Sequence, residues 1–340
     1  MELRDIKERL GQVDMFLCEE LRRARIPGIA VAIIHGGEVL KAQGYGLANV
    51  ELDVPVTERT VFQSASVGKQ FTAAAILLLA EDGALRLDDP ITRLVTEGPA
   101  EWSSITLHHL LTHTSGIPDY EDTLDFQREH TEDDLVRFAA TLPLESRPGE
   151  RWTYSSTGYA LLGVIISRIT GRFYGEFLRE RIFRPAGMPS ARVISEADIV
   201  PQRAAAYRLV DGELKNRAWV APSLNTTADG SLHLSLLDMI VWDRVVRASA
   251  ILRPESWAAM HRRVLLNNGT THRYGLGIYI DEEPDGSVYK HGGSWQGYRP
   301  FYARYLADDL SLVVLANLAS AEPEDTADGI RAIVRGRDPS

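Results

Sequence analysis

The sequence predicts an α+β fold, an α/β sandwich in which helices flank an antiparallel sheet built from strands at both ends of the chain. Three observations indicate this class. Two apolar, β-branched runs follow the first helical pattern, several strand-like segments gather near the C-terminus, and the stretch between them carries mainly helical patterns. We therefore expect residues 1–62 and 215–340 to form a sheet domain, with residues 63–214 as a mostly helical insertion.

The N-terminal elements follow from apolar periodicity. Residues 3–25 have the pattern of an amphipathic helix that stops before Pro27. Cys18 lies in this helix beside apolar residues, so we expect a small buried hydrophobe, and one cysteine cannot form an intrachain disulfide. Residues 28–34 and 38–45 are apolar runs joined by His-Gly-Gly, which is the signal of a β-hairpin.

The middle of the chain is expected to be helical, and the C-terminal part returns to strands. Thr106 is the expected cap of one short helix, and Gly83 the expected end of the helix that starts at Ser66. Turn residues stand at 285–286 and 308–309. The expected helices cover residues 66–83, 106–112, 131–141, 152–169, 174–183, 231–246 and 323–334, and the expected strands cover 274–280, 287–290, 301–306 and 311–316.

Charge and composition restrict the class of partner. The net charge of −10 argues against nucleic acid or an anionic membrane as the main partner, and favours a small molecule. The N-terminus lacks the apolar core of a secretory signal, and no run of about 18 apolar residues occurs. We therefore expect a soluble, cytoplasmic protein, or a periplasmic or secreted one if a leader was removed. The oligomeric state stays open.

Ser66 and Lys69 form a Ser-x-x-Lys motif that opens a helix of almost uniformly apolar residues. Residues three apart face the same side of a helix, so the Lys69 ammonium can reach the Ser66 hydroxyl. Burial disfavours charged lysine, so we expect the pKa of Lys69 to be lowered and its neutral amine to act as a base. Free N–H groups at the helix start favour negative charge on Ser66, which predicts an activated nucleophile.

Acyl transfer through serine also needs a proton donor for the leaving group and N–H groups for the oxyanion. Tyr154 and Ser156 follow a Pro-Gly turn at the start of a predicted helix, where their hydroxyls can be presented to a substrate. His291 ends a predicted strand, and Gly292 and Gly293 after it allow a substrate to approach the backbone closely.

Together, the Ser-x-x-Lys, Tyr-x-Ser and His-x-Gly motifs resemble those of the penicillin-recognising serine hydrolases. The likeness is to the branch of class C β-lactamases, D-alanyl-D-alanine carboxypeptidases and family VIII esterases. It extends to residues 62–72, 110–118 and 148–155, and it covers nearly the whole chain. The resemblance implies a β-lactamase/transpeptidase-like fold and needs no metal ion or organic cofactor.

The resemblance also implies a role for each motif residue. Ser66 would be the acylated nucleophile, Lys69 its base, and Tyr154 the group that passes a proton to the leaving group and later helps to activate water. The backbone N–H groups of Ser66 and Ser294 would form the oxyanion hole. His291 would bond Tyr154 or the substrate.

One position departs from the family, which usually has asparagine where this chain has Ser156. The asparagine amide bridges the lysine and the acyl-side amide of the substrate, whereas a hydroxyl is shorter and offers one donor against two. Amides and lactams should therefore suffer more than esters. We expect a serine hydrolase that acts on small carboxylic esters through an acyl-enzyme, with D-amino-acid peptides or amides as the first alternative and β-lactams as the second.

Four aromatic residues are candidates for the wall of the substrate pocket. Trp295 and Tyr298 follow the third motif, and Tyr120 follows a Ser-Gly turn. Trp219 is a weaker candidate of the same kind. Each of them could equally be an ordinary core residue.

Three rival hypotheses compete with this reading. His109 and His113 have a metal-ligand spacing, but the run between them lacks the glutamate of a zinc-protease helix, and two ligands are too few. A Ser-His-Asp triad would need scattered residues to converge, since no Gly-x-Ser-x-Gly elbow occurs. A non-catalytic penicillin-binding sensor or scaffold could keep Ser66 and acylate without turnover. A persistent acyl adduct would identify the sensor, and rapid release would identify a hydrolase.

Overall fold

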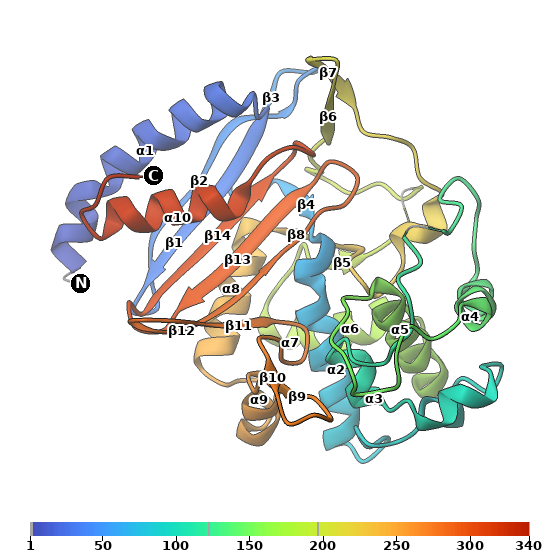
Figure 1. Ribbon diagram of the computed structural model, residues 1–340. Coiled ribbons are helices and arrows are strands. Elements are labelled where there is room, and N and C mark those ends of the chain that lie inside the picture. Colours follow the sequence, from blue (N-terminus) through green and yellow to red (C-terminus); the bar gives the residue numbers. More distant parts are fainter. Residues whose placement is uncertain (1–2, 122, 196, 340) are drawn as a thin grey trace.

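The computed structural model describes residues 3–121, 123–195 and 197–339. Within these residues, a seven-stranded antiparallel sheet forms the centre of the fold (Figure 1). Its strands come from both ends of the chain, so the predicted α+β class is confirmed. In spatial order the strands are β11 (Tyr279–Glu283), β12 (Gly286–Gly292), β13 (Arg299–Tyr305), β14 (Leu310–Ala316), β1 (Gly28–His35), β2 (Glu38–Asn49) and β3 (Val54–Pro55).

Strand β1 is an inner strand that pairs with β14 on one side and with β2 on the other. Ile29 lies opposite Ala316, so strands from the two ends of the sequence are direct neighbours. Side chains alternate between the two faces of a strand. The even-numbered residues of 30–34 accordingly join one hydrophobic core, and the odd-numbered residues of 29–33 join a second core on the opposite face. Burial on both faces explains why β1 reads as a continuous apolar run.

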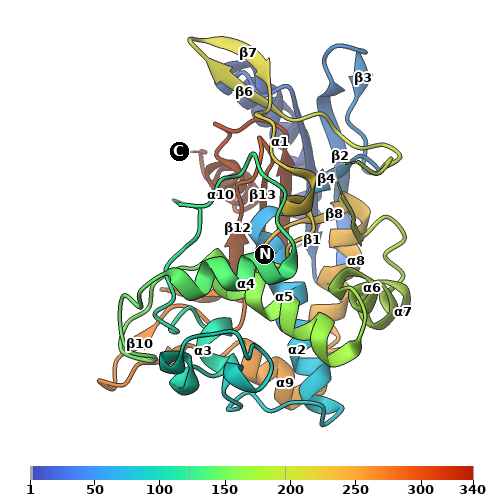
Figure 2. The same ribbon diagram turned by 90° about the vertical axis from the view of Figure 1, so that its right-hand side faces the viewer.

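Helices cover both faces of the sheet. Helices α1 (Leu3–Ala24) and α10 (Pro323–Val334) lie side by side on one face, and α8 (Leu236–Arg247) packs on the other (Figures 1 and 2). The remaining helices and helical turns are η1 (Ala65–Gly68), α2 (Lys69–Glu81), η2 (Ile91–Arg93), η3 (Ala100–Ser104), α3 (Leu107–Leu111), α4 (Glu132–Thr141), α5 (Ser156–Thr170), α6 (Tyr174–Leu178), η4 (Arg179–Phe183), α7 (Arg184–Ala186), η5 (Pro222–Asn225) and α9 (Pro254–Met260).

Three smaller sheets complete the fold. Strand β8 (Leu232–Ser235) pairs with both β4 (Val61–Gln63) and β5 (Arg192–Val193), which fixes the chain immediately before Ser66. The other two sheets are hairpins, formed by β6 (Tyr207–Val210) with β7 (Glu213–Asn216) and by β9 (Val264–Leu265) with β10 (Thr271–His272).

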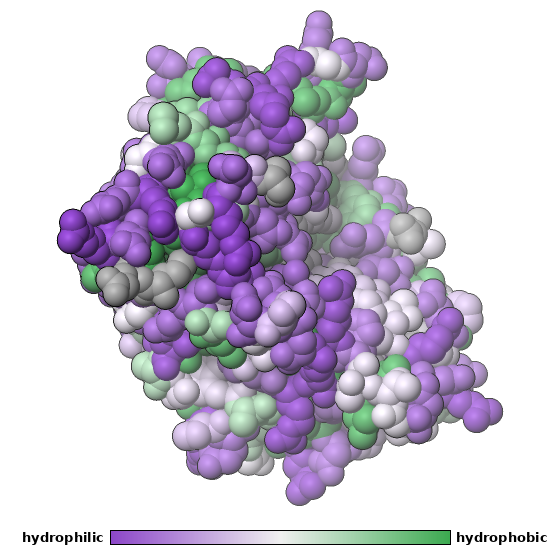
Figure 3. Space-filling model, turned by 60° about the vertical axis from the view of Figure 1, so that its left-hand side comes forward, coloured by the Kyte–Doolittle hydropathy of each residue, from purple (hydrophilic) through white to green (hydrophobic). Residues whose placement is uncertain are grey.

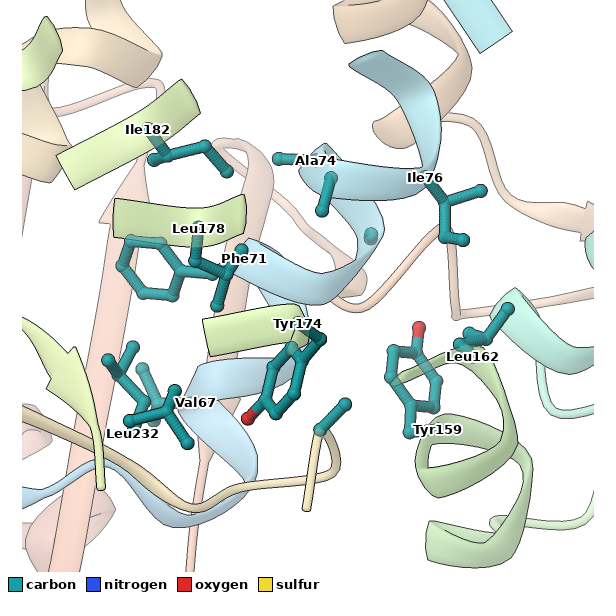
Figure 4. Close-up of a cluster of buried hydrophobic side chains, with 14 of the residues drawn as sticks. Val67, Phe71, Ala74, Ile76, Tyr159, Leu162, Tyr174, Leu178, Ile182 and Leu232 are labelled. Carbon is teal, nitrogen blue, oxygen red and sulfur yellow. The ribbon is translucent and has the colours of Figure 1, made fainter. Parts of the chain in front are cut away.

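Helix α2 is buried on nearly every side. All its residues from Lys69 to Leu79 are buried, and the Phe71 ring lies 4.3 Å from that of Trp242. Figure 4 shows α6 and α5 approaching α2 from two sides, with Tyr174 and Tyr159 turned toward it. This close packing holds the start of α2, and therefore Lys69, in a fixed position.

Several local expectations differ from the structure. Helix α1 buries the side that carries Val13 and Leu17. Cys18 follows Leu17 directly and therefore lies on a different side of the helix, where it is exposed. The expected helix over 231–246 begins only at residue 236, because the preceding residues pair as β8. The expected strand over 274–280 begins only at residue 279, because Gly275 and Gly277 form a turn.

The surface carries its exposed apolar residues in small groups. Figure 3 brings the side of α1 forward, and hydrophilic residues predominate on that face. Among the described residues, no helix is both long enough and apolar enough to cross a membrane.

Candidate active site

Ser66 lies in the 3₁₀ turn η1, and Lys69 is the first residue of α2. The Lys69 ammonium donates hydrogen bonds to the Ser66 hydroxyl at 3.1 Å and to the backbone carbonyl of Asp229 at 2.7 Å. The Lys69 side chain is completely buried. A nucleophile and a lysine therefore face each other as the motif predicts, with a carbonyl from a distant loop as third partner.

A second Ser-x-x-Lys, Ser287 to Lys290, has no such geometry. It lies in strand β12, where residues three apart point to opposite faces. The Lys290 ammonium pairs with Asp281 at 2.7 Å and with Glu324 at 2.8 Å. The spacing therefore creates a nucleophile with a lysine partner only at the start of α2.

The turn around Ser66 is enclosed by glycines. A Cβ atom added at Gly293 would lie 2.8 Å from the backbone N of Ser66, and one added at Gly230 would lie 2.7 Å from the carbonyl carbon of Ala65. Ala65 itself adopts a φ of +41°, which is uncommon for a residue with a side chain. The end of β12 and the loop before β8 can thus approach the nucleophile only because both positions are glycine.

The pKa of Lys69 is raised, although burial alone would lower it. Tyr154 and the carboxylates of Asp229 and Glu121 favour the ammonium form enough to outweigh burial. The sequence-based expectation of a lowered pKa is therefore wrong, because it counted burial and omitted acids that only folding brings near. Lys69 carries its proton at rest and holds Ser66 by donating to it.

Tyr154 precedes α5, whose N-cap is Ser155 and whose first residue is Ser156. Expected as part of a helix over 152–169, Tyr154 is instead in an extended segment. Burial raises its pKa, while the nearby Lys69 ammonium and Ser66 hydroxyl oppose that shift. The hydroxyl is buried and forms no hydrogen bond of normal geometry with the described residues, although Ser66 and Lys69 both approach it. The Lys69 ammonium lies 4.9 Å from the centre of its ring.

His291 is buried near the end of β12. Its Nδ1 donates to the carbonyl of Gly292 at 2.6 Å, and its Nε2 accepts from the Tyr274 hydroxyl at 3.0 Å. Burial lowers the pKa of His291 to about 3, so the ring is neutral. The resemblance implied a bond to Tyr154 or to a substrate; the structure places Nε2 on Tyr274, and the rings of His291 and Tyr154 are 6.3 Å apart.

An acidic group borders the nucleophile. The Ser156 hydroxyl donates to Glu121 at 2.9 Å, and its backbone N donates to Asp119 at 2.8 Å. The Tyr120 hydroxyl donates to Asp229 at 2.6 Å. Burial raises the pKa of both Asp119 and Glu121, and their negative neighbours add to the shift. Such a group of carboxylates favours the binding of a cation.

Ser66 opens into a cleft of about 480 Å³. A small recess adjoins it and shares Ser66, Glu121 and Ser294 with it, adding Asp229 and Trp295. The residues that line the cleft are Ser66, Glu121, Tyr154, Arg273, Tyr279, Lys290, His291, Gly292, Ser294, Phe301 and Glu324.

The predicted pocket aromatics separate into two groups. Trp295 lies at the recess, where its indole N–H donates to Asn225 at 2.7 Å, and Tyr120 reaches the recess through Asp229. Tyr298 is buried with its hydroxyl on the carbonyl of Ala204 at 2.6 Å, and it lines a different pocket together with the exposed Trp219.

Three residues of the site carried no local signal in the sequence. Asp229 supplies a carbonyl to Lys69, Asn225 holds Trp295, and Tyr274 holds His291. Asp229 stands beside Gly230, and Tyr274 beside Gly275. Glycine marks a close approach of backbones at both places, which is the one pattern that could have directed attention to them.

The histidine pair with metal-ligand spacing has other partners. His109 Nδ1 lies 3.1 Å from Thr106, which caps α3, and His113 Nδ1 accepts from the backbone N of Ser155. In the part of the chain that the structure describes, no group of three or more His, Cys, Asp or Glu residues could hold a metal ion.

Ser66 and Tyr154 border one cleft, and the buried Lys69 is hydrogen-bonded to Ser66, which is the arrangement of the serine-hydrolase class. The family described as Beta-lactamase matches residues 13–335. The chain belongs to this family, as the motif resemblance indicated.

Individual relatives agree with this membership. Penicillin-binding protein 4* of Bacillus subtilis (strain 168) is 31% identical over 315 residues, covering 87% of this chain and 68% of the relative. A D-aminopeptidase of Gluconobacter oxydans (strain 621H) is 30% identical over 304 residues, covering 87% of this chain and only 56% of the relative. The octameric penicillin-binding protein homologue from Pyrococcus abyssi has a TM-score of 0.85 and 30% identity, covering 97% of this chain and 78% of that one.

Proposed function

We propose that this protein hydrolyses small amides or short peptides that carry a free amino group beside the scissile carbonyl, through an acyl-enzyme on Ser66. The observation that carries this proposal is the acidic group at the nucleophile. Glu121 borders both the cleft and its recess, and Asp229 borders the recess. An ammonium group there would meet two carboxylates, and charge-assisted hydrogen bonds are stronger than neutral ones.

The chemical steps follow from the residues at the cleft. The reactive form of the site is the minor one in which Tyr154 has lost its proton beside the Lys69 ammonium, which favours the phenolate. The Ser66 oxygen attacks the amide carbonyl as its proton passes to the Tyr154 oxygen. The backbone N–H groups of Ser66 and Ser294 would stabilise the oxyanion. Tyr154 then gives a proton to the leaving amine, the C–N bond breaks, and an acyl ester remains on Ser66. Water hydrolyses this ester by the reverse sequence of proton transfers and releases the acid.

Amide substrates are favoured over the esters that the sequence suggested. That expectation rested on Ser156, whose hydroxyl is shorter and offers one donor where an asparagine amide would bridge Lys69 and the acyl-side amide of the substrate. Here the backbone carbonyl of Asp229 accepts from Lys69 at 2.7 Å. The lysine half of that bridge is therefore replaced, whereas the half that reaches the substrate is not, and the ammonium site proposed above is the feature that favours amides of amino acids. The relative from Gluconobacter oxydans is a D-aminopeptidase, which supports a D-configured substrate.

The test compares D-alaninamide, L-alaninamide, N-acetyl-D-alaninamide and D-alanine methyl ester on the wild-type protein. We expect the free D-amide to be the best amide substrate and Ser66→Ala to abolish its turnover. Glu121→Gln should raise KM for D-alaninamide by about ten- to a hundredfold, since a hydrogen bond to a charged group contributes roughly 1.5–3 kcal/mol. N-acetyl-D-alaninamide should be almost unaffected by this change.

Glu129→Gln is the matched control. Glu129 is an exposed acid eight residues after Glu121, and its carboxylate accepts a hydrogen bond from the backbone N of Ser223. It should leave both KM values unchanged. Equal turnover of the free and acetylated amides would contradict an ammonium site. Turnover of the ester without any amide would restore the ester hypothesis, and an acyl adduct that never hydrolyses would identify a sensor.

A further inference from the structure

We propose that His113 is a positioning residue that fixes Tyr154 for proton transfer, by accepting a hydrogen bond from the backbone next to Tyr154 and by stacking on its ring. The inference rests on the acyl-enzyme chemistry proposed above and holds for any leaving group that needs a proton. The sequence singled out His113 only for its metal-ligand spacing from His109. His113 is not among the residues that line the cleft, so it would act on Tyr154 and not on the substrate.

His113 contacts the segment of Tyr154 at three points. Its Nδ1 accepts a hydrogen bond from the backbone N of Ser155 at 3.1 Å, and its carbonyl accepts one from the backbone N of Thr153 at 2.9 Å. Its ring lies 4.2 Å from the Tyr154 ring at an angle of 35°. The residues before and after Tyr154, and the phenol ring itself, are therefore all held by one side chain and its backbone.

The backbone of His113 adopts a φ of +58°. This left-handed conformation is uncommon for residues other than glycine, although histidine, asparagine and aspartate adopt it more readily than most. It typically costs on the order of 1–3 kcal/mol and persists where the surroundings enforce it. The chain that leaves α3 is thereby turned so that the His113 ring reaches Tyr154.

The hydrogen bond from Ser155 fixes the tautomer of His113. Because a backbone N–H can only donate, Nδ1 must be without a proton, and the proton of the neutral ring is on Nε2. Nε2 is buried and has no hydrogen-bond partner among the described residues. Burial above all keeps the pKa of His113 far below its usual range, and neighbouring Lys69 and His291 add to this. An unpaired buried donor costs about 1–3 kcal/mol, so an apolar ring would be the better choice if packing were the only role.

The other neighbours of the Tyr154 ring lie farther from it than His113 does, and the Lys69 ammonium is 4.9 Å from its centre. Tyr274 meets it edge-on at 6.5 Å and His291 lies 6.3 Å away. The Tyr154 hydroxyl makes no hydrogen bond of normal geometry with the described residues. Loss of the His113 contacts should therefore let the phenol ring move, and a misplacement of about 1 Å can cost roughly a hundredfold in rate.

The test separates proton transfer from general damage by the choice of leaving group. An amide or an alkyl ester needs a proton on its leaving group, whereas a p-nitrophenyl ester of the same acyl group releases a stable anion. His113→Phe keeps a ring and removes the acceptor, and His113→Asn keeps an acceptor near the position of Nδ1 and tolerates the positive φ. We expect His113→Phe to lower the pre-steady-state acylation rate more for the poor leaving groups than for the p-nitrophenyl ester, by a further factor of about ten to a hundred, with KM little changed. All these substrates need Tyr154 to take the Ser66 proton, but only the poor leaving groups also need a proton from it. His113→Asn should recover most of the loss.

A double-variant cycle tests whether His113 and Tyr154 act in the same step. In the Tyr154→Phe background, His113→Phe should cost nothing further with amide or alkyl ester, because both changes remove the same proton transfer. His109→Asn is the matched control, since His109 bonds Thr106 at the start of α3 and is not among the described residues that line the cleft. If His113→Phe does not fold, His113→Ala replaces it with the same expected ratio. Equal loss on all leaving groups, or full additivity with Tyr154→Phe, would overturn the proposal. A wild-type protein that accepts only esters would refute the amide function and leave this test intact.

Discussion

Gly293→Ala should damage the site through backbone displacement alone. The added Cβ atom would lie 2.8 Å from the backbone N of Ser66, whereas ordinary van der Waals contact begins at 3.4 Å. The segment after β12 and the Ser66 turn must therefore separate by about 0.6 Å to reach ordinary contact, the difference between these two distances. Neither side of this contact is a flexible side chain that could move away cheaply, because Ser66 N is itself backbone.

The separation falls on the proposed oxyanion hole. Its two donors would be the N–H groups of Ser66 and Ser294, and Ser294 follows Gly293 directly. Loss of one oxyanion donor typically costs a factor of about 10²–10³ in kcat, or roughly 2.7–4 kcal/mol. We expect Gly293→Ala to lower the rate of acylation on the order of a hundredfold while the protein stays folded.

The assay measures the acylation burst with p-nitrophenyl acetate, together with thermal unfolding of the same preparation. Gly292→Ala is the matched comparison, since a Cβ atom at Gly292 would find its nearest neighbour, Phe301, at an ordinary 3.6 Å. It should lose far less acylation rate than Gly293→Ala. Similar rates for the two variants, or a wild-type rate for Gly293→Ala, would refute the placement of the oxyanion hole.

Three further predictions concern single side chains. Tyr154→Phe removes only a hydroxyl and should lower amide turnover by roughly a hundredfold in steady-state kinetics; unchanged turnover would assign the proton transfer elsewhere. Ser156→Asn should raise the ratio of amide to ester turnover by about two- to tenfold, as one neutral hydrogen bond contributes about 0.5–1.5 kcal/mol; a flat ratio would show that this position does not set the preference. His291 has a folded-state pKa of about 3 against an ordinary 6.5, so its burial costs stability as pH falls below 6.5. At pH 5 the loss is on the order of 2 kcal/mol, and urea unfolding of His291→Asn should show a smaller loss between pH 7 and pH 5.

The fold and the three motifs could be predicted because each depends on local patterns. Apolar runs and the turn residues between them located β1 and β2, and the strand over 311–316 differs from β14 by one residue at its start. Residues three apart on a helix must meet, so the spacing of Ser66 and Lys69 was enough to pair them. The boundaries of such elements were predictable to within a few residues.

The electrostatics of the site could not be predicted in the same way. Asp229 is far from Lys69 in the sequence, yet it helps to reverse the expected direction of the lysine pKa. Segment 232–235 has helical character by sequence and becomes a strand only because β4 and β5 offer partners on both sides. Long-range contacts decide both outcomes, and no local pattern encodes them.

The direct pairing of β1 with β14 has a consequence for biosynthesis. Ile29 can pair with Ala316 only after Ala316 has been synthesised. At about 5–20 residues per second, the interval between the synthesis of the two residues is roughly 15–60 s. During that time a long apolar strand keeps one edge unpaired, so the nascent chain should depend on chaperones that cover such edges. Ser66 and Lys69 are synthesised early, but Gly293 and Ser294 arrive only near the end. The growing chain therefore holds the proposed nucleophile and the N–H group of Ser66 without the second proposed oxyanion donor, and we expect it not to react with substrate until synthesis is almost complete.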